Sequence, residues 1–199
     1  TGWVRRELRN GHISRTQALR GVWAIGTYQM GFSDVEAVIR DAGRILKGQD
    51  ESAVDARTRA FWREDLLPNI RPGARAAMRA HHAAGDRVTL LTSNSEYMCH
   101  AVASELDLHG WGCNRFVVED GRFTGEMIEP LCVEAGKVTH AKRLADEAGL
   151  ALSDCVFYTD SYSDLAALEA VGEPVVVHPD PRLARTAARR GWRVETWGG

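Results

Sequence analysis

The sequence predicts an α/β fold, in which a parallel sheet carries helices on both faces and a small helical cap precedes it. After residue 68, short apolar segments alternate with helical segments, which is typical of parallel sheets covered by helices. Before residue 68, apolar residues recur only at helical spacing. We therefore expect a cap over residues 1–67 and an α/β core over residues 68–199.

Capping boxes and apolar stripes indicate the helices of the first third. Ser14 with Gln17, and Ser33 with Glu36, match the spacing at which two side chains satisfy the free N–H groups of a helix start. Gly48 is expected to end the helix that follows the second box. The predicted helices cover residues 3–8, 14–28, 35–46 and 52–67.

The second part is divided by glycines and polar turns. Asp120 and Gly121 between two strand-like segments predict a hairpin. We expect strands over residues 88–91, 115–118, 122–128, 155–159, 175–177 and 194–197. The helices expected between and after them cover residues 73–84, 96–106, 137–148, 164–171 and 182–190.

Composition excludes several classes of protein. The 199 residues contain 25 basic and 27 acidic side chains, and a nucleic-acid binder would show a basic excess. No apolar run approaches the ~20 residues of a membrane helix, so no membrane partner is expected. The four cysteines form no C-x-x-C pair, which argues against zinc or a disulfide framework and fits a reducing, cytoplasmic setting.

Thr92 and Ser93 follow an apolar strand and precede a helix, where hydroxyl and N–H groups suit a phosphate oxygen. Taken alone, they are better explained as helix caps. Lys137 begins a helix, where its charge opposes the helix dipole and would neutralise a phosphate. Taken alone, it is better explained as a surface lysine.

Asp160 and Asp164 lie four positions apart, where the chain passes from the strand at 155–159 to the helix expected over 164–171. We expect Asp160 in a hydrophobic neighbourhood, where an unpaired charge is unfavourable and a cation would compensate it. Mg²⁺ prefers oxygen ligands, commonly one or two carboxylates with waters and substrate phosphate. Asp164 is also well explained as an acidic residue in the first turn of a helix.

In this order, the strand ending at Thr92, the lysine at 137 and the D-x-x-x-D pair at 160–164 resemble the haloacid-dehalogenase superfamily, in particular its phosphoserine-phosphatase-like subfamily IB. The segments at 71–73 and 177–183 are also similar, so the resemblance covers residues 68–197. It implies a HAD-like (Rossmannoid) core with a helical cap. It also implies Mg²⁺-dependent hydrolysis of a phosphate monoester of a small metabolite, through an aspartyl phosphate.

The resemblance assigns a role to each candidate. Thr92, with the N–H of Ser93, would bind a phosphoryl oxygen, and Lys137 would offset the charge of nucleophile and phosphate. Asp160 would be a metal ligand, and Asp164 would orient Asp160 or a metal-bound water.

The first motif of that family, an apolar strand followed by D-x-D, does not occur in these residues. We expect it upstream, on roughly 10–15 further residues that include a strand and a short connection. The 199 residues alone are then expected to be inactive. Two alternatives stay open: a non-catalytic protein that binds a phosphorylated ligand or a partner, and a phosphotransferase in which an alcohol replaces water.

Overall fold

The computed structural model describes residues 2–16, 19 and 35–198, and the chain forms two compact units. The first unit contains Thr1–Pro68, Ser95–Ala101 and Asn114–Leu131. The second contains Asn69–Asn94, Val102–Cys113 and Cys132–Gly199. One unit boundary coincides with the division expected near residue 68, while the assignment of a cap and a core stays a prediction.

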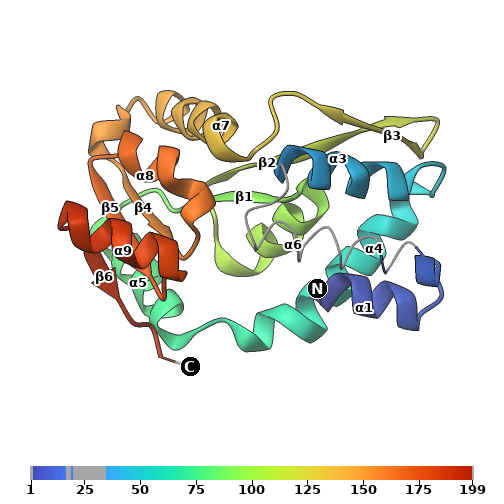
Figure 1. Ribbon diagram of the computed structural model, residues 1–199, viewed down its shortest axis with the longest axis horizontal. Coiled ribbons are helices and arrows are strands. Elements are labelled where there is room, and N and C mark those ends of the chain that lie inside the picture. Colours follow the sequence, from blue (N-terminus) through green and yellow to red (C-terminus); the bar gives the residue numbers. More distant parts are fainter. Residues whose placement is uncertain (1, 17–18, 20–34, 199) are drawn as a thin grey trace. The chain divides into compact units, whose positions relative to one another are not determined.

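Helices make up the beginning of the first unit. Asp50 starts one of them, because its Oδ1 accepts hydrogen bonds from the N–H of Ala53 (3.0 Å) and the hydroxyl of Ser52 (2.6 Å). The expected helix over 14–28 and the capping box at Ser33 lie largely or partly outside the described residues. The described helices are α1 (Gly2–Arg9), α3 (Val35–Leu46) and α4 (Glu51–Phe61), which continues as a π-helical turn (Trp62–Leu66) (Figure 1).

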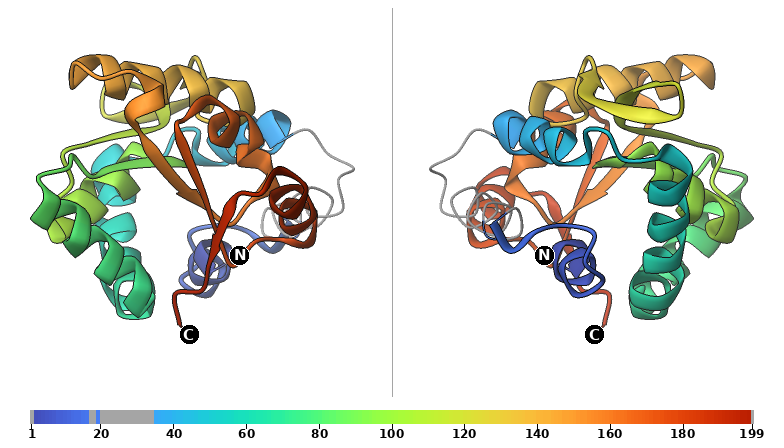
Figure 2. Two further views of the ribbon diagram at one scale, coloured as in Figure 1. Left: turned by 90° about the vertical axis from the view of Figure 1, so that its left-hand side faces the viewer. Right: turned by 90° about the vertical axis from the view of Figure 1, so that its right-hand side faces the viewer.

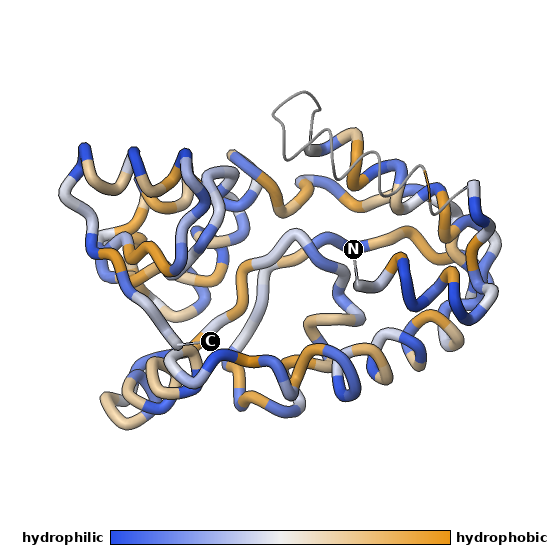
Figure 3. Tube along the Cα trace, turned by 60° about the horizontal axis from the view of Figure 1, so that its bottom comes forward, coloured by the Kyte–Doolittle hydropathy of each residue, from blue (hydrophilic) through white to orange (hydrophobic). Residues whose placement is uncertain are grey.

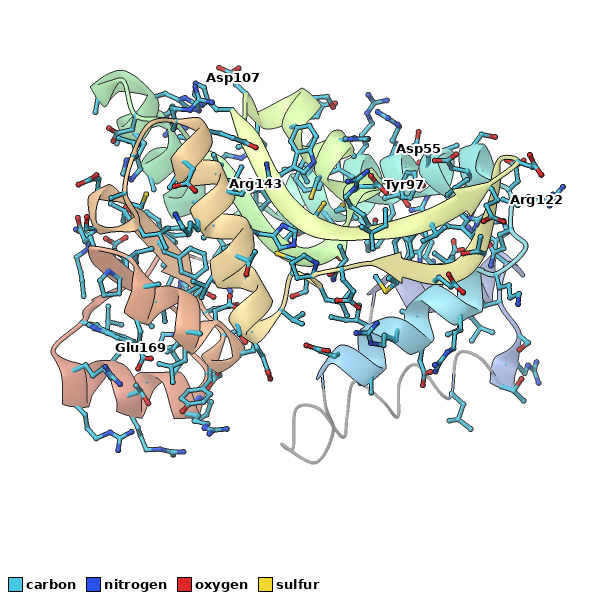
Figure 4. All side chains as sticks on the ribbon, turned by 90° about the horizontal axis from the view of Figure 1, so that it is seen from above. Asp55, Tyr97, Asp107, Arg122, Arg143 and Glu169 are labelled. Carbon is cyan, nitrogen blue, oxygen red and sulfur yellow. The ribbon has the colours of Figure 1, made fainter. Side chains whose placement is uncertain are left out.

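A hairpin completes the first unit. Strand β3 (Arg122–Ile128) pairs antiparallel with β2 (Gly110–Glu119), whose first residues belong to the second unit. Asp120 and Gly121 adopt positive φ angles of 48° and 71°, which confirms the predicted turn. Tyr97 of α6 (Glu96–Leu106), labelled in Figure 4, packs edge-on against Phe123 in a core that includes Val54.

A parallel sheet forms the centre of the second unit. Strands β4 (Val156–Thr159), β5 (Glu173–Val177) and β6 (Arg193–Glu195) lie side by side in that order (Figure 2, left). Strand β5 ends in three consecutive valines, whereas hydrophilic and hydrophobic residues alternate along the helices (Figure 3). One face packs against α8 (Leu165–Ala170) and α9 (Pro181–Arg190) in a core of Leu168, Val176, Leu183 and Ala187.

Further helices in the second unit are α5 (Pro72–Ala84) and α7 (Glu134–Glu147). Arg143 of α7 donates to the carbonyl of Trp111 at 2.8 Å, and Glu169 of α8 pairs with Arg190 of α9 (Figure 4). These contacts hold helices to their neighbours at the surface. None of the helices in the described part of the chain combines the length and apolarity needed to cross a bilayer.

The hydrogen bonds define two three-stranded sheets, β1-β2-β3 and β4-β5-β6, where the sequence suggested one. Strand β1 (Thr89–Ser95) and strand β4 do not pair with each other. Instead, both line a cavity of about 230 Å³ in the second unit, together with side chains of α7 such as Leu144.

Gly172 offers a test of this packing, because a Cβ there would lie 1.9 Å from the backbone carbonyl oxygen of Ser153. We expect Gly172→Ala to lower the free energy of unfolding by about 3 kcal/mol, since a backbone atom cannot rotate away. Gly149→Ala is the matched control: Gly149 has a φ of +71° but open space around it, so a loss of only about 1 kcal/mol is expected. Urea unfolding of both variants measures the difference, and equal losses would contradict the described contact.

Candidate functional site

A buried ion pair lies at the centre of the candidate site. Lys137 is 5% exposed and Asp164 is 6% exposed, and Lys137 Nζ lies 2.5 Å from Asp164 Oδ1. The hydroxyl of Thr159 donates to Asp164 Oδ2 at 2.7 Å. Lys137 is therefore not a surface lysine: α7 begins at Glu134, three residues earlier than expected, and directs Lys137 inward.

Burial makes each member of this pair depend on the other. A charge removed from water is strongly unfavourable unless a partner of opposite charge and further hydrogen bonds compensate it. Asp164 has both oxygens engaged, one by Lys137 and the other by Thr159. The pair thus fixes the first turn of α7 to the segment that follows β4.

Asp160 differs from the expectation, because it is exposed rather than surrounded by apolar side chains. Strand β4 ends at Thr159, and the chain bends at the next residue. Among the described residues the Asp160 carboxylate has no hydrogen-bond or ion-pair partner. The predicted desolvation of Asp160 was wrong. Asp160 is distinguished instead by a free carboxylate on a main chain that hydrogen bonds hold in place.

The segment after β4 is fixed by its own hydrogen bonds. The N–H of Ser161 donates to the hydroxyl of Thr159 at 3.2 Å, and the N–H of Asp164 donates to the carbonyl of Ser161 at 3.2 Å. Ser161 and Ser163 also join their hydroxyls at 2.9 Å. These hydrogen bonds fix the main-chain positions of Asp160 and Asp164 relative to each other.

Thr92 lies inside β1 and does not cap the next helix. Ser95 takes that role, since its hydroxyl accepts from the N–H of Met98 at 3.3 Å. The hydroxyl oxygen of Thr92 accepts from the N–H of Asn94 at 3.2 Å, which leaves the hydroxyl proton of Thr92 available. Ser93, the next residue, is exposed.

Cys132 connects Thr92 with the ion pair. Its side chain is fully buried and accepts a hydrogen bond from the backbone N–H of Thr92, close to the charges of Lys137 and Asp164. Burial raises the pKa of the Cys132 thiol to about 12 despite the nearby lysine. The structure thus brings Thr92, Lys137 and Asp164 around one buried thiol.

Thr159 and Cys132 were not identified from the sequence. A threonine at the end of a strand is ordinary in β structure, and an isolated cysteine carries no spacing signal. Only the contacts with Asp164 and Thr92 reveal their positions in the site.

The donors present suit a sparsely coordinated cation. Within the described residues, no three His, Cys, Asp or Glu side chains form a ready-made cage. Mg²⁺ does not need one, because it keeps waters and commonly takes only one or two carboxylates and substrate phosphate. The free carboxylate of Asp160 fits this requirement, whereas Asp164 is already engaged and fits an orienting role.

Comparison with known proteins connects this geometry with a family. The family profile described as haloacid dehalogenase-like hydrolase matches residues 2–169. A solved protein of unknown function from Bordetella pertussis Tohama I has a TM-score of 0.86 at 27% identity, covering 97% of this chain and 89% of that one.

Two curated relatives carry the names of phosphatases. The chain is 30% identical over 176 residues to a histidinol-phosphatase of Neisseria meningitidis, covering 84% of this chain and 77% of that protein. It is 32% identical over 162 residues to the phosphoserine phosphatase SerB1 of Mycobacterium tuberculosis, covering 81% of this chain. The chain spans about half, 53%, of that mycobacterial protein.

The buried thiol allows a test of the site's packing. At pH 8 a thiol with a pKa of about 12 is ionised in only about one molecule in ten thousand, and the thiolate is the reactive form. We expect Ellman's reagent to modify Cys155, which is partly exposed, and to leave Cys132 unmodified from pH 7 to pH 9.

Cys155→Ser should therefore abolish the reaction of the folded protein, and urea should expose the remaining thiols. A native reaction that disappears in Cys132→Ser would contradict the described burial.

Proposed function

Because the chain belongs to the haloacid dehalogenase-like hydrolases, we propose that it serves the Mg²⁺-dependent hydrolysis of a phosphate monoester of a small metabolite. The observation that carries this proposal is the combination of the buried Lys137–Asp164 pair with the unpartnered carboxylate of Asp160 among the described residues. A site that binds both a cation and a phosphate needs a free carboxylate beside a fixed lysine. The stability of the fold does not require these side chains together.

The side chains divide the work as follows. A bound Mg²⁺ would draw charge from the phosphoryl oxygens. Asp160 would hold the cation, and Asp164, held by Lys137 and Thr159, would orient a water or the Asp160 side chain. The hydroxyl of Thr92 and the N–H of Ser93 would bind phosphoryl oxygens, and Lys137 would offset negative charge on the phosphate and the nucleophile.

The nucleophile in this proposal is an aspartate on a strand between β1 and β4. The cavity of about 230 Å³ supports this position, since apolar side chains such as Leu90, Leu91 and Phe157 line it. A parallel strand there would supply hydrogen bonds to both neighbours and end beside Thr92 and Asp160. Its carboxylate would attack phosphorus, the bond to the alcohol oxygen would break, and water would then hydrolyse the aspartyl phosphate.

The substrate class follows from the relatives by similarity. Their names refer to histidinol phosphate and phosphoserine, and both compounds are small phosphate monoesters. A small phosphorylated metabolite is therefore the substrate that we propose. An alcohol that takes the place of water would convert the same site into a phosphotransferase.

The second candidate function is binding of a phosphorylated ligand without turnover. The observation in its favour is that the 199 residues contain no D-x-D motif. The free carboxylate of Asp160 favours catalysis, because binding an anion gains nothing from an extra negative charge unless a cation is present.

Asp160→Asn tests the proposed function in the natural full-length protein. We expect Mg²⁺-dependent hydrolysis of p-nitrophenyl phosphate to fall about 100-fold or more, because the loss of a metal ligand removes several kcal/mol of transition-state stabilisation. Asp154→Asn is the matched control, since Asp154 Oδ2 accepts a hydrogen bond from the N–H of Ala151 (3.0 Å) in a neighbouring turn.

The control should retain the activity of the unchanged protein. Equal activity in Asp160→Asn and Asp154→Asn would show that Asp160 holds no catalytic cation. Tight binding of phosphate by the unchanged protein without any hydrolysis would favour the binding function.

A further inference from the structure

Asp180 uses both carboxylate oxygens on two different elements of the second unit. Oδ1 accepts from the N–H groups of Arg182 (2.8 Å) and Leu183 (2.9 Å) at the start of α9. Oδ2 accepts from the N–H of Tyr162 at 2.6 Å, within the segment that follows β4. One side chain therefore joins the start of α9 to the segment that carries Asp160.

The main chain of Asp180 adds a second connection to the same segment. Its N–H donates to the carbonyl oxygen of Asp160 at 2.9 Å. Asp160 and Tyr162 are thus both bound by one residue, on either side of Ser161. This pair of bonds restricts the main chain directly where the free carboxylate of Asp160 leaves it.

The side chain of Tyr162 is held by the same part of α9. The guanidinium of Arg182 lies 3.7 Å from the centre of the Tyr162 ring, a close cation–π contact. The ring also packs against the core formed by Leu168, Val176, Leu183 and Ala187. Because this core is fully buried, the packing of Tyr162 against it restricts the movement of the segment between β4 and α8.

Helix capping alone does not explain these contacts. A capping aspartate needs one oxygen for the first N–H groups of its helix, and Oδ1 supplies it. The bond from Oδ2 to Tyr162 and the bond from the Asp180 N–H to Asp160 lie outside that role. They restrict the segment between β4 and α8.

We propose that Asp180 is a positioning residue, which fixes the main chain of Asp160 so that its carboxylate is aimed before a divalent cation binds. This inference rests on the proposed function, because it assigns Asp180 to the same cation site. A ligand held in place in advance loses less conformational freedom when the cation binds. Outer groups that orient metal ligands commonly change metal affinity about 10–100-fold when they are replaced.

Asp180→Asn separates the two roles of the carboxylate. Asparagine caps helices as well as aspartate does, so α9 should keep its start. Its single carbonyl oxygen cannot serve both elements, so an N–H group would face the N–H of Tyr162. Asp50→Asn is the matched control, because Asp50 caps α4 in the first unit.

Two measurements on the full-length protein decide the inference. Amide hydrogen exchange at Tyr162 should become about tenfold faster in Asp180→Asn. The Mg²⁺ concentration for half-maximal hydrolysis should rise about tenfold in the same variant. Its kcat at saturating Mg²⁺ should stay close to that of the unchanged protein. Asp50→Asn should change neither quantity. If Asp180→Asn does not fold, Asp180→Ser gives the same test, since serine still caps but cannot reach Tyr162.

Unchanged Mg²⁺ dependence in Asp180→Asn would overturn the positioning role, even if its melting temperature fell. A lower melting temperature is the result expected of a purely structural residue. An unchanged protein that neither binds Mg²⁺ nor hydrolyses phosphate esters would overturn the proposed function, and the positioning role with it.

Discussion

The arrangement of the site depends on the buried ion pair between Lys137 and Asp164. Neither charge is stable in its position without the other, because both are almost fully removed from water. The pair joins α7 to the segment after β4, and Thr159 completes the coordination of Asp164. Asp160 is left as an additional carboxylate beside a neutralised pair, which gives the site a net negative charge suited to a cation.

The second constraint is the incomplete pairing of the sheets. Strands β1 and β4 belong to different sheets and share a cavity lined largely by apolar side chains. Backbone N–H and C=O groups at strand edges need hydrogen-bond partners, and a strand in this cavity would supply them to both neighbours. The same strand would bring its last residue to the edge where Thr92 and Asp160 lie. In the proposed function, this one strand would complete both the sheet and the active site.

Much of the fold followed from local sequence signals. Asp120 and Gly121 were predicted to form the hairpin turn, and their positive φ angles confirm it. The expected strands over 155–159 and 175–177 located β4 and β5 within a residue or two. These signals are local, since each is decided by the backbone preferences of a few neighbouring residues.

The sequence predicted which residues belong to the site, but it did not predict their contacts. Lys137, Asp160 and Asp164 were identified by their order along the chain, yet the sequence could not show that Lys137 is buried and that Asp160 is exposed. Burial depends on where a strand ends and which element packs next to it. The role of Asp180 was not identified from the sequence, because only the tertiary structure shows the contact of its second oxygen with Tyr162.

The most direct test is a crystal structure of the full-length protein grown with Mg²⁺ and inorganic phosphate. We expect a cation bound to the Asp160 carboxylate, a phosphate in contact with Thr92 and Lys137, and an aspartate on a strand between β1 and β4. A phosphate bound elsewhere, with Asp160 free and the cavity between these strands empty, would contradict the assignment of this site.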